Sequence, residues 1–175
     1  MPVVMAAGSS GILMHEAIGH AFEADFIRTG ESIFSDKLGQ RICDSHITIV
    51  DDGTQPYDAG MLRFDDEGTP GQRTVLVEKG ILNSYLYDRI SARYFGVQPT
   101  GNGRRESFRH IPLPRMRSTY MCAGDATEED IIHSVKRGIY AHSFTNGQVQ
   151  IGAGDFTFFM KKGWHIDDGH LTTPL

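Results

Sequence analysis

A helix predicted near the N-terminus constrains this chain more than any other feature. Residues Gly8–Thr29 carry apolar side chains at helical spacing, and Ser9 and Ser10 stand near its start as candidate N-caps. Within this segment, the run His15-Glu16-Ala17-Ile18-Gly19-His20 places two imidazoles five positions apart, with a carboxylate directly after the first. Imidazoles that hold an ion and a glutamate that takes a proton from water are the side chains that a zinc peptidase needs.

The spacing of the two histidines is awkward for a regular helix. At about 100° per residue, five steps leave the two rings about 140° apart around the axis. Two nitrogens that both lie about 2.0–2.1 Å from one ion cannot diverge so far. We therefore expect either a one-residue π-bulge or a helix that ends near Gly19 with His20 turned back. Gly19 would ease either distortion because it lacks a Cβ. The competing interpretation is an ordinary helix with two incidental histidines.

Composition narrows the class of protein. The 175 residues fit a single domain spanning 1–175, and a net charge of −5 makes binding to nucleic acid unlikely. Two cysteines, Cys43 and Cys122, provide no disulfide framework, which favours a reducing compartment. No apolar run is long enough to cross a bilayer, so we expect no membrane association. Residues 1–10 lack the positively charged start of a signal peptide.

The remainder of the chain predicts an α+β fold. Strands are expected at 2–7, 42–50, 74–77, 81–87 and 115–121, and Glu78-Lys79-Gly80 predicts a hairpin between the third and the fourth. Short helices are expected at 88–95 and 127–137, and Thr127 with Asp130 forms a variant of the capping box at the start of the second helix. Asn146-Gly147 and Asp168-Gly169 favour tight hairpin turns and predict four or five short strands in the C-terminal part. Because strands and helices do not alternate regularly, we expect this α+β class in preference to a parallel βαβ sheet, with an antiparallel C-terminal β-meander.

The chain resembles the TldD/PmbA family, and specifically its catalytic TldD-like branch. Beyond His-Glu-x-x-x-His, the similarity is carried in the family's order by further blocks: Phe22–Phe26, Val50–Thr54, Asp65–Gln72, Pro99–Ser107, Pro114–Met116 and Gly138–Ala141. For the fold, the resemblance implies a motif-bearing helix packed on a largely antiparallel twisted sheet or open barrel. For the function, it implies a cytoplasmic zinc metallopeptidase that cleaves short or unfolded peptides. It implies that His15 and His20 are metal ligands and that Glu16 is the general base toward metal-bound water. It also implies a partner, either a TldE/PmbA-like subunit or a second copy.

One departure from the family concerns the third ligand. In the family, a cysteine near the C-terminal end completes the zinc site, and this sequence stops at Leu175 without that segment or the family's N-terminal domain. We therefore expect a partial catalytic domain whose third ligand lies beyond Leu175. Cys43 and Cys122 are weaker candidates, because a free cysteine is more often a small buried apolar residue. The alternative function is a non-catalytic module that binds a partner subunit.

Two polar loops admit several interpretations. Asn102, Arg104 and Arg105 in the glycine-rich loop at 101–110 are tentative contacts for a peptide substrate, although a solvated loop fits equally well. The loop lacks the lysine of a nucleotide-binding P-loop. The acidic run 65–67 predicts a turn capped by backbone N–H groups in preference to a Ca²⁺ or Mg²⁺ site. Glu23 and Asp25 are candidate partners of a ligating imidazole or plain surface charges.

Overall fold

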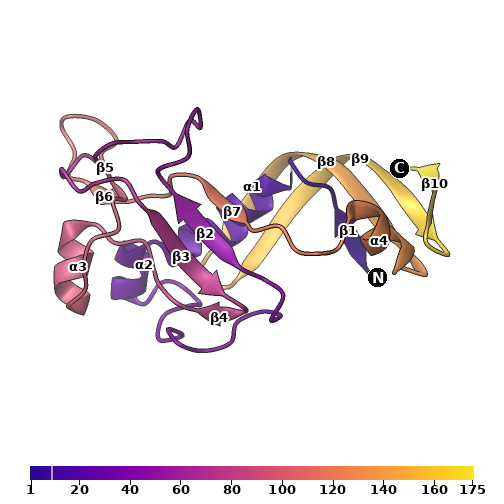
Figure 1. Ribbon diagram of the computed structural model, residues 1–175, viewed down its shortest axis with the longest axis horizontal. Helices are drawn as coiled ribbons and strands as arrows, with labels where there is room; N and C mark the ends of the chain where they lie inside the picture. The colour runs from indigo at the N-terminus through magenta and orange to yellow at the C-terminus, as the bar shows by residue number, and fades with distance from the viewer. Residues whose placement is uncertain (9) are drawn as a thin grey trace.

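The computed structural model describes residues 1–8 and 10–175 and is elongated, with one sheet towards each end (Figure 1). One sheet has the strand order β4-β3-β2-β7, and we call it, with the helices α2 and α3, the compact half. The other has the order β1-β8-β9-β10, and we call it, with α4, the hairpin half. Strands β5 (Gly103–Arg104) and β6 (Leu113–Pro114) form a separate small ladder. The pairing is antiparallel apart from β1 against β8, which confirms the α+β prediction.

The N-terminal helical segment is less regular than predicted. It comprises α1 (Gly11–Leu13), a π-helical turn η1 (Met14–Gly19), a 3₁₀ turn η2 (His20–Phe22) and α2 (Ala24–Thr29). The expected continuous helix is broken at Glu23, whose ψ of 123° is extended. The break has a tertiary cause, because Leu86 donates to the Phe22 carbonyl and accepts from the Ala24 N–H. Ser10 is the N-cap of α1 but its side chain makes no capping bond, and Ser9 lies outside the described residues.

The compact half follows the predicted hairpin closely. Strands β3 (Arg73–Glu78) and β4 (Ile81–Leu82) pair across Lys79 and Gly80, both of which have positive φ. The central strand β2 (Ile49–Asp52) is shorter than the predicted 42–50. Asp44 accounts for the difference, because its side chain accepts the His46 N–H and folds that segment into a turn. Helix α3 (Arg89–Phe95) forms as predicted, capped by Asp88 and closed at Gly96.

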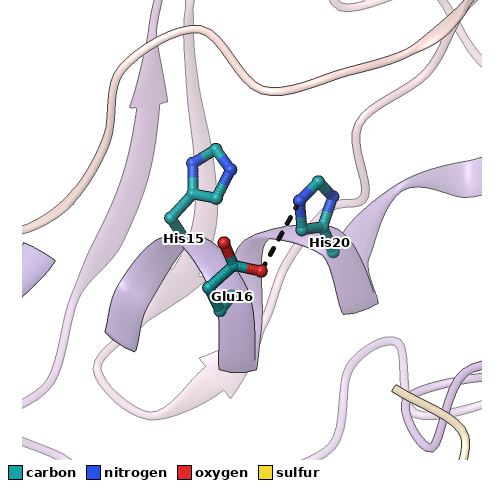
Figure 2. A group of neighbouring side chains, drawn as sticks. All are labelled: His15, Glu16 and His20. Carbon is teal, nitrogen blue, oxygen red and sulfur yellow. Dashed lines mark ion pairs between the residues drawn. The ribbon is translucent and has the colours of Figure 1, made fainter. Parts of the chain in front are cut away.

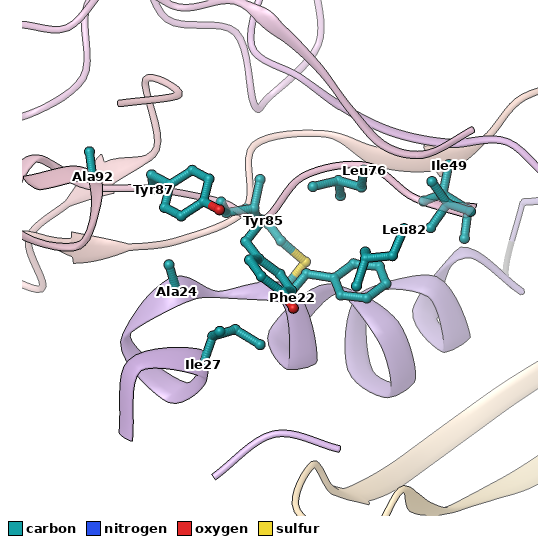
Figure 3. Packing of buried hydrophobic residues seen from close by; sticks show 12 residues of the cluster. Phe22, Ala24, Ile27, Ile49, Leu76, Leu82, Tyr85, Tyr87 and Ala92 are labelled. Carbon is teal, nitrogen blue, oxygen red and sulfur yellow. The ribbon is translucent and has the colours of Figure 1, made fainter. Parts of the chain in front are cut away.

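The principal hydrophobic core lies between the motif segment and the compact sheet. It includes Phe22 from η2, Leu76 and Val77 from β3, and Leu82 from β4, all of them completely buried. Figure 3 shows these side chains between the helical segment and the strands above it. Ala24 and Ala92 continue the cluster to where α2 meets α3. The apolar side of the motif segment is therefore the surface that fixes it to the sheet.

The hairpin half differs most from expectation. Strands β8 (Arg137–Gln150) and β9 (Asp155–Asp167) form one long hairpin, which β10 (His170–Pro174) extends antiparallel and β1 (Val3–Met5) extends parallel. The meander is confirmed, but the prediction of four or five short strands and of a turn at Asn146-Gly147 was wrong. The chain continues through Gly147 with a register shift and turns at 151–154. The predicted turn at Asp168-Gly169 is present, with positive φ at both residues.

The remaining predicted elements are shorter than expected because tertiary pairing takes their ends. Helix α4 covers Glu128–His133 and begins with the predicted capping box of Thr127 and Asp130. It does not reach Arg137, which pairs with Asp167 in the long hairpin. The predicted strand at 115–121 is reduced to β7 (Thr119–Met121). None of the helices within residues 1–8 and 10–175 has the length and apolar character to cross a bilayer.

Candidate metal centre

The π turn brings the two motif histidines together. In η1 the N–H of His20 bonds the carbonyl of His15, which is the i→i+5 pattern of a π turn. A spacing of five, which separates two rings on a regular helix, here places them on the same side. The ring centroids lie 4.8 Å apart with an interplanar angle of 88°. This geometry confirms the predicted π distortion and excludes the expectation that the helix ends at Gly19.

Gly19 serves the turn by leaving space rather than by unusual backbone freedom. Its φ and ψ of −58° and −51° are ordinary helical values, so any residue tolerates its conformation. A Cβ at this position would lie 1.9 Å from the sulfur of Met116, a buried member of the core. A side chain at position 19 would therefore force Met116 to move.

Glu16 completes a cluster of three possible donors. The ligand atoms of His15, Glu16 and His20 all lie within 4.8 Å of one another. Among the described residues, this is the group of three or more histidine, cysteine or acidic side chains that is close enough to hold one metal ion. Glu16 Oε2 lies 4.0 Å from His20 Nε2. Figure 2 shows both rings and the carboxylate on one side of the helical segment. Two imidazoles with a carboxylate beside them suit zinc, which binds nitrogen ligands readily.

His20 is oriented by a buried carboxylate. Its Nδ1 lies 3.0 Å from Oε2 of Glu23, so Nδ1–H donates to the carboxylate and Nε2, on the Glu16 side, is left for a metal. The hydrogen bond to Glu23 raises the pKa of His20. Burial raises the pKa of Glu23 itself, against the effect of that bond. Of the two carboxylates suggested by the sequence, Glu23 is thus confirmed as the partner of the imidazole.

His15 has a more open environment than His20. It is exposed, and its ring meets the ring of His20 edge to face. Partial burial and the neighbouring His20 both lower the pKa of His15. A second positive charge next to His20 is unfavourable, so the pair favours at least one neutral imidazole. Metal binding requires both rings to be neutral, and the environment of His15 already favours that form.

Behind Glu23 lies an ion-pair network that sequence patterns did not predict. Arg115 Nη1 lies 3.2 Å from Glu23 Oε2 and 3.1 Å from Asp25 Oδ2. Asp25 therefore pairs with Arg115 and makes no contact with an imidazole. Arg115 lies within the Pro114–Met116 block that resembles the family, but the block does not indicate its partner. No local signal identifies it, because Glu23 is 92 positions away along the chain.

The predicted substrate loop divides into a buried part and an exposed part. Asn102 is only 1% exposed, and its amide donates to Asp51 Oδ2 at 2.7 Å and to the Arg115 carbonyl at 2.9 Å. It lies beneath the loop surface and holds the loop in place. Arg104 and Arg105 are exposed, and the charge of Arg104 is close enough to His15 to lower its pKa slightly. The loop thus brings the charge of Arg104 within electrostatic range of His15.

Asp51 is a further buried carboxylate, and the sequence predicted no chemical role for it. Its Oδ1 accepts from the Arg117 N–H and from Thr119 Oγ1, and its Oδ2 accepts from Asn102. Burial is the main influence on Asp51 and raises its pKa. A signal was present, since Asp51 and Asp52 directly follow the apolar residues of a buried strand. Asp51 supports the loop from inside the sheet.

Other candidate ligands lie outside the cluster. Cys43 packs against the principal core, and Cys122 accepts a hydrogen bond from Arg73 at 3.6 Å. Neither belongs to the group of donors around His15 and His20 in the described part of the chain. The acidic run at 65–67 forms the predicted turn, with Asp65 Oδ1 accepting from the N–H groups of Glu67 and Thr69.

The described cluster brings two imidazoles and a carboxylate together, and comparison with known proteins assigns the family. The model of the PmbA/TldA metallopeptidase C-terminal domain matches residues 1–175, and the chain belongs to this family. It is 49% identical over 174 residues to a protein named metalloprotease TldD homolog from Buchnera aphidicola, covering 99% of this chain and 36% of that protein. It is 35% identical to a zinc metalloprotease TldD homolog from Saccharolobus solfataricus, covering 99% and 39%.

The fold is also that of a solved relative. The crystal structure of TldE from Thermococcus kodakarensis matches with a TM-score of 0.85 at 24% identity, covering 98% of this chain and 39% of that one. This likeness shows the fold. The chain spans less than two fifths of the length of these relatives. The family is one of metalloproteases, and zinc is the metal named for one of its members.

Proposed function

We propose that this chain carries the zinc-binding helix of a peptidase that hydrolyses peptide bonds in short or unfolded peptides. The observation that carries the proposal is the π turn, which gathers the donor atoms of His15, Glu16 and His20 within 4.8 Å. His15 and His20 would hold the ion. Bound zinc acts as a Lewis acid that polarises the scissile carbonyl and makes water a better proton donor.

Glu16 has the chemistry and the position of the general base. Its carboxylate stands beside both imidazoles, so it reaches a water molecule held between them and the substrate carbonyl. It takes a proton from that water as the oxygen attacks the carbonyl carbon. It then returns the proton to the amine nitrogen as the peptide bond breaks. The half-buried setting of Glu16 keeps it near the reacting atoms without sealing it from solvent.

A third protein ligand completes the proposed site. Family resemblance assigns this role to a cysteine, and Cys43 and Cys122 do not meet the two histidines. We therefore propose that a cysteine other than these two is the third ligand. We also propose that the partner is a homologous TldE-like subunit or a second copy, and that the protein acts in the cytoplasm. For the substrate, we propose contacts from Arg104 and Arg105 at the exposed loop, with Asn102 supporting the loop from below.

The surroundings of the helix favour substrates bound through their main chain. Strands β1 and β7 lie at sheet edges and, with α1 and α4, line an apolar groove of about 610 Å³ that reaches Met14. An extended peptide added to a sheet edge gains main-chain hydrogen bonds with little dependence on side chains. Such a mode suits a peptidase for unfolded peptides.

The decisive test is Glu16→Gln in the full chain. We expect hydrolysis of unstructured peptides to fall about 10²–10⁴-fold while zinc content stays unchanged, because the amide cannot accept the proton. Glu129→Gln on the exposed face of α4 is the matched control and should cleave at the wild-type rate. Cleavage by the Glu16→Gln protein at a rate near that of the wild type would remove the residue from this role.

A second candidate function is a non-catalytic, partner-binding module. In its favour, the cluster found among the described residues contains two imidazoles and no third histidine or cysteine that could complete a zinc site. Zinc analysis separates the two functions. About one zinc per chain, lost in His15→Ala, supports the peptidase, whereas a folded protein that binds its partner without metal supports the module.

A further inference from the structure

We infer that Arg115 is a positioning residue of the metal site, which acts by fixing the Glu23 carboxylate that orients His20. The inference rests on the proposed function, because it takes His20 to be a metal ligand. It assigns a role to a residue that lies in a different segment of the chain from the motif. It also predicts that the affinity for zinc depends on a guanidinium that does not touch the ion.

The first step concerns the isolation of Glu23. Its side chain is completely buried, and a buried carboxylate is costly unless hydrogen bonds and an opposite charge compensate for it. Oε1 has no hydrogen-bond partner among the described residues. Oε2 receives both contacts that the side chain makes, from His20 Nδ1 at 3.0 Å and from Arg115 Nη1 at 3.2 Å. Among the described residues, these two donors are thus the polar groups that orient the carboxylate.

The second step concerns how firmly Arg115 is held. Its backbone N–H donates to the Asn102 carbonyl at 2.8 Å, and the Asn102 amide donates to its carbonyl at 2.9 Å. The same amide donates to the buried Asp51. At its other end, the guanidinium bonds Asp25 Oδ2 at 3.1 Å and the Pro114 carbonyl at 2.6 Å. Arg115 is therefore anchored at both ends, to the sheet and to α2.

The third step concerns why the metal site needs this support. Glu23 lies where the helical segment is broken, between η2 and α2, and Leu86 holds the backbone there while the carboxylate takes its bonds from side chains. Arg115 joins Glu23 to Asp25 across that break. The His20–Glu23 bond in turn selects the tautomer that leaves Nε2 available. Carboxylates that bond a ligating imidazole in this way commonly change metal affinity 10–100-fold when removed.

The test compares metal binding in variants of the full chain. Zinc affinity is measured by competition with a chromophoric chelator, and ligand geometry by the visible absorption of the protein loaded with Co²⁺. We expect Glu23→Gln to bind zinc about 10–100-fold more weakly, and Arg115→Met about tenfold more weakly with an altered cobalt spectrum. Arg115→Lys should fall between Arg115→Met and the wild type, because a lysine keeps the charge but is shorter and lacks the planar guanidinium.

The control is Arg28→Met, which removes an exposed arginine from the end of α2 and should leave both measurements unchanged. Folding is monitored for each variant, because a purely structural arginine would alter stability and leave the cobalt spectrum of the folded protein as it was. If Arg115→Met does not fold, Arg115→Lys and Asp25→Asn take its place. Unchanged zinc affinity and cobalt spectrum in the folded variants would overturn the inference.

The outcomes also distinguish this inference from the proposed function. A wild-type protein that binds zinc, loses affinity in Arg115→Met and cleaves no peptide would support the positioning role and contradict the peptidase. If the wild-type protein cleaves peptides and Arg115→Met equals it in metal affinity and cobalt spectrum, the peptidase function is supported and the positioning role of Arg115 is contradicted. A wild-type protein that takes up no zinc would contradict both.

Discussion

The compact half and the hairpin half of this molecule are stabilised in different ways. In the compact half, twelve buried apolar residues form one cluster, and the site-bearing segment contributes Phe22 to it directly. In the hairpin half, the cluster of buried apolar residues has five members, and large side chains such as Phe156 and Phe159 are mostly exposed. The compact half therefore relies on burial of apolar area, whereas the hairpin half relies on the backbone ladder between β8 and β9.

The same contrast divides the proposed metal site. His20 is on the side supported by the compact half, through Glu23 and Arg115, while His15 is exposed and meets mainly the other ring. One of the two proposed ligands is thus oriented in advance by buried groups, and the other remains free to adjust. Preorganised ligands lower the cost of ordering when a metal binds.

The largest expected effect comes from truncating a leucine in each half. Leu76→Ala, at a fully buried position on β3, should lower the free energy of unfolding by about 2–5 kcal/mol, because it leaves a cavity in the main cluster. Leu171→Ala on β10, where the side chain is 43% exposed, should change it by less than about 0.5 kcal/mol. Urea unfolding of both variants measures the difference. Comparable losses would mean that the two halves do not differ in this way.

A second comparison uses two glycines of the motif segment. Gly19→Ala should destabilise the protein by about 1–3 kcal/mol, because the new methyl group would collide with Met116. Gly11→Ala places its methyl group in open space at helical φ and should stabilise by up to about 1 kcal/mol. Thermal unfolding at matched metal content compares the two. A neutral Gly19→Ala would show that Met116 moves aside freely.

Helix caps sharpen the comparison at a smaller scale. Asp88 caps α3 in the compact half from a buried position, and Thr127 caps α4 in the hairpin half from an exposed one. Asp88→Ala should cost near the upper end of about 0.5–2 kcal/mol, and Thr127→Ala near the lower end. Denaturant unfolding ranks the two variants. The reverse order would indicate that burial does not strengthen the cap.

The smallest expected effect is a pH dependence around His20. Its pKa is raised above the ordinary value of 6.5, so in the metal-free protein the protonated imidazole contributes stability that is fully present below pH 6.5. That stability is lost as pH rises through the raised pKa of the folded state. Glu23→Gln should flatten this part of the stability profile. NMR titration measures the pKa of each histidine separately, and that of His20 should lie above that of His15, which is lowered.

Local sequence signals predicted much of the structure. The capping box at Thr127 and the hairpin across Lys79-Gly80 both depend on groups within a few residues of one another. The spacing of His15 and His20 similarly predicted the π turn, because two ligands of one ion must share a side. Signals of this kind failed for the long hairpin, where Asn146-Gly147 resembles a turn but cross-strand pairing carries the chain onward.

What the sequence determined by itself was the chemistry: two imidazoles, one carboxylate and the helical turn that unites them. What only the tertiary structure decided was which groups hold that turn in place. Glu23 leaves the helix because Leu86 bonds the backbone on either side of it, and it is neutralised by an arginine 92 positions later. Asn102, which donates to an aspartate 51 positions away, became a support beneath the loop. Such partners are chosen by packing across the whole chain, so no local pattern of residues reveals them.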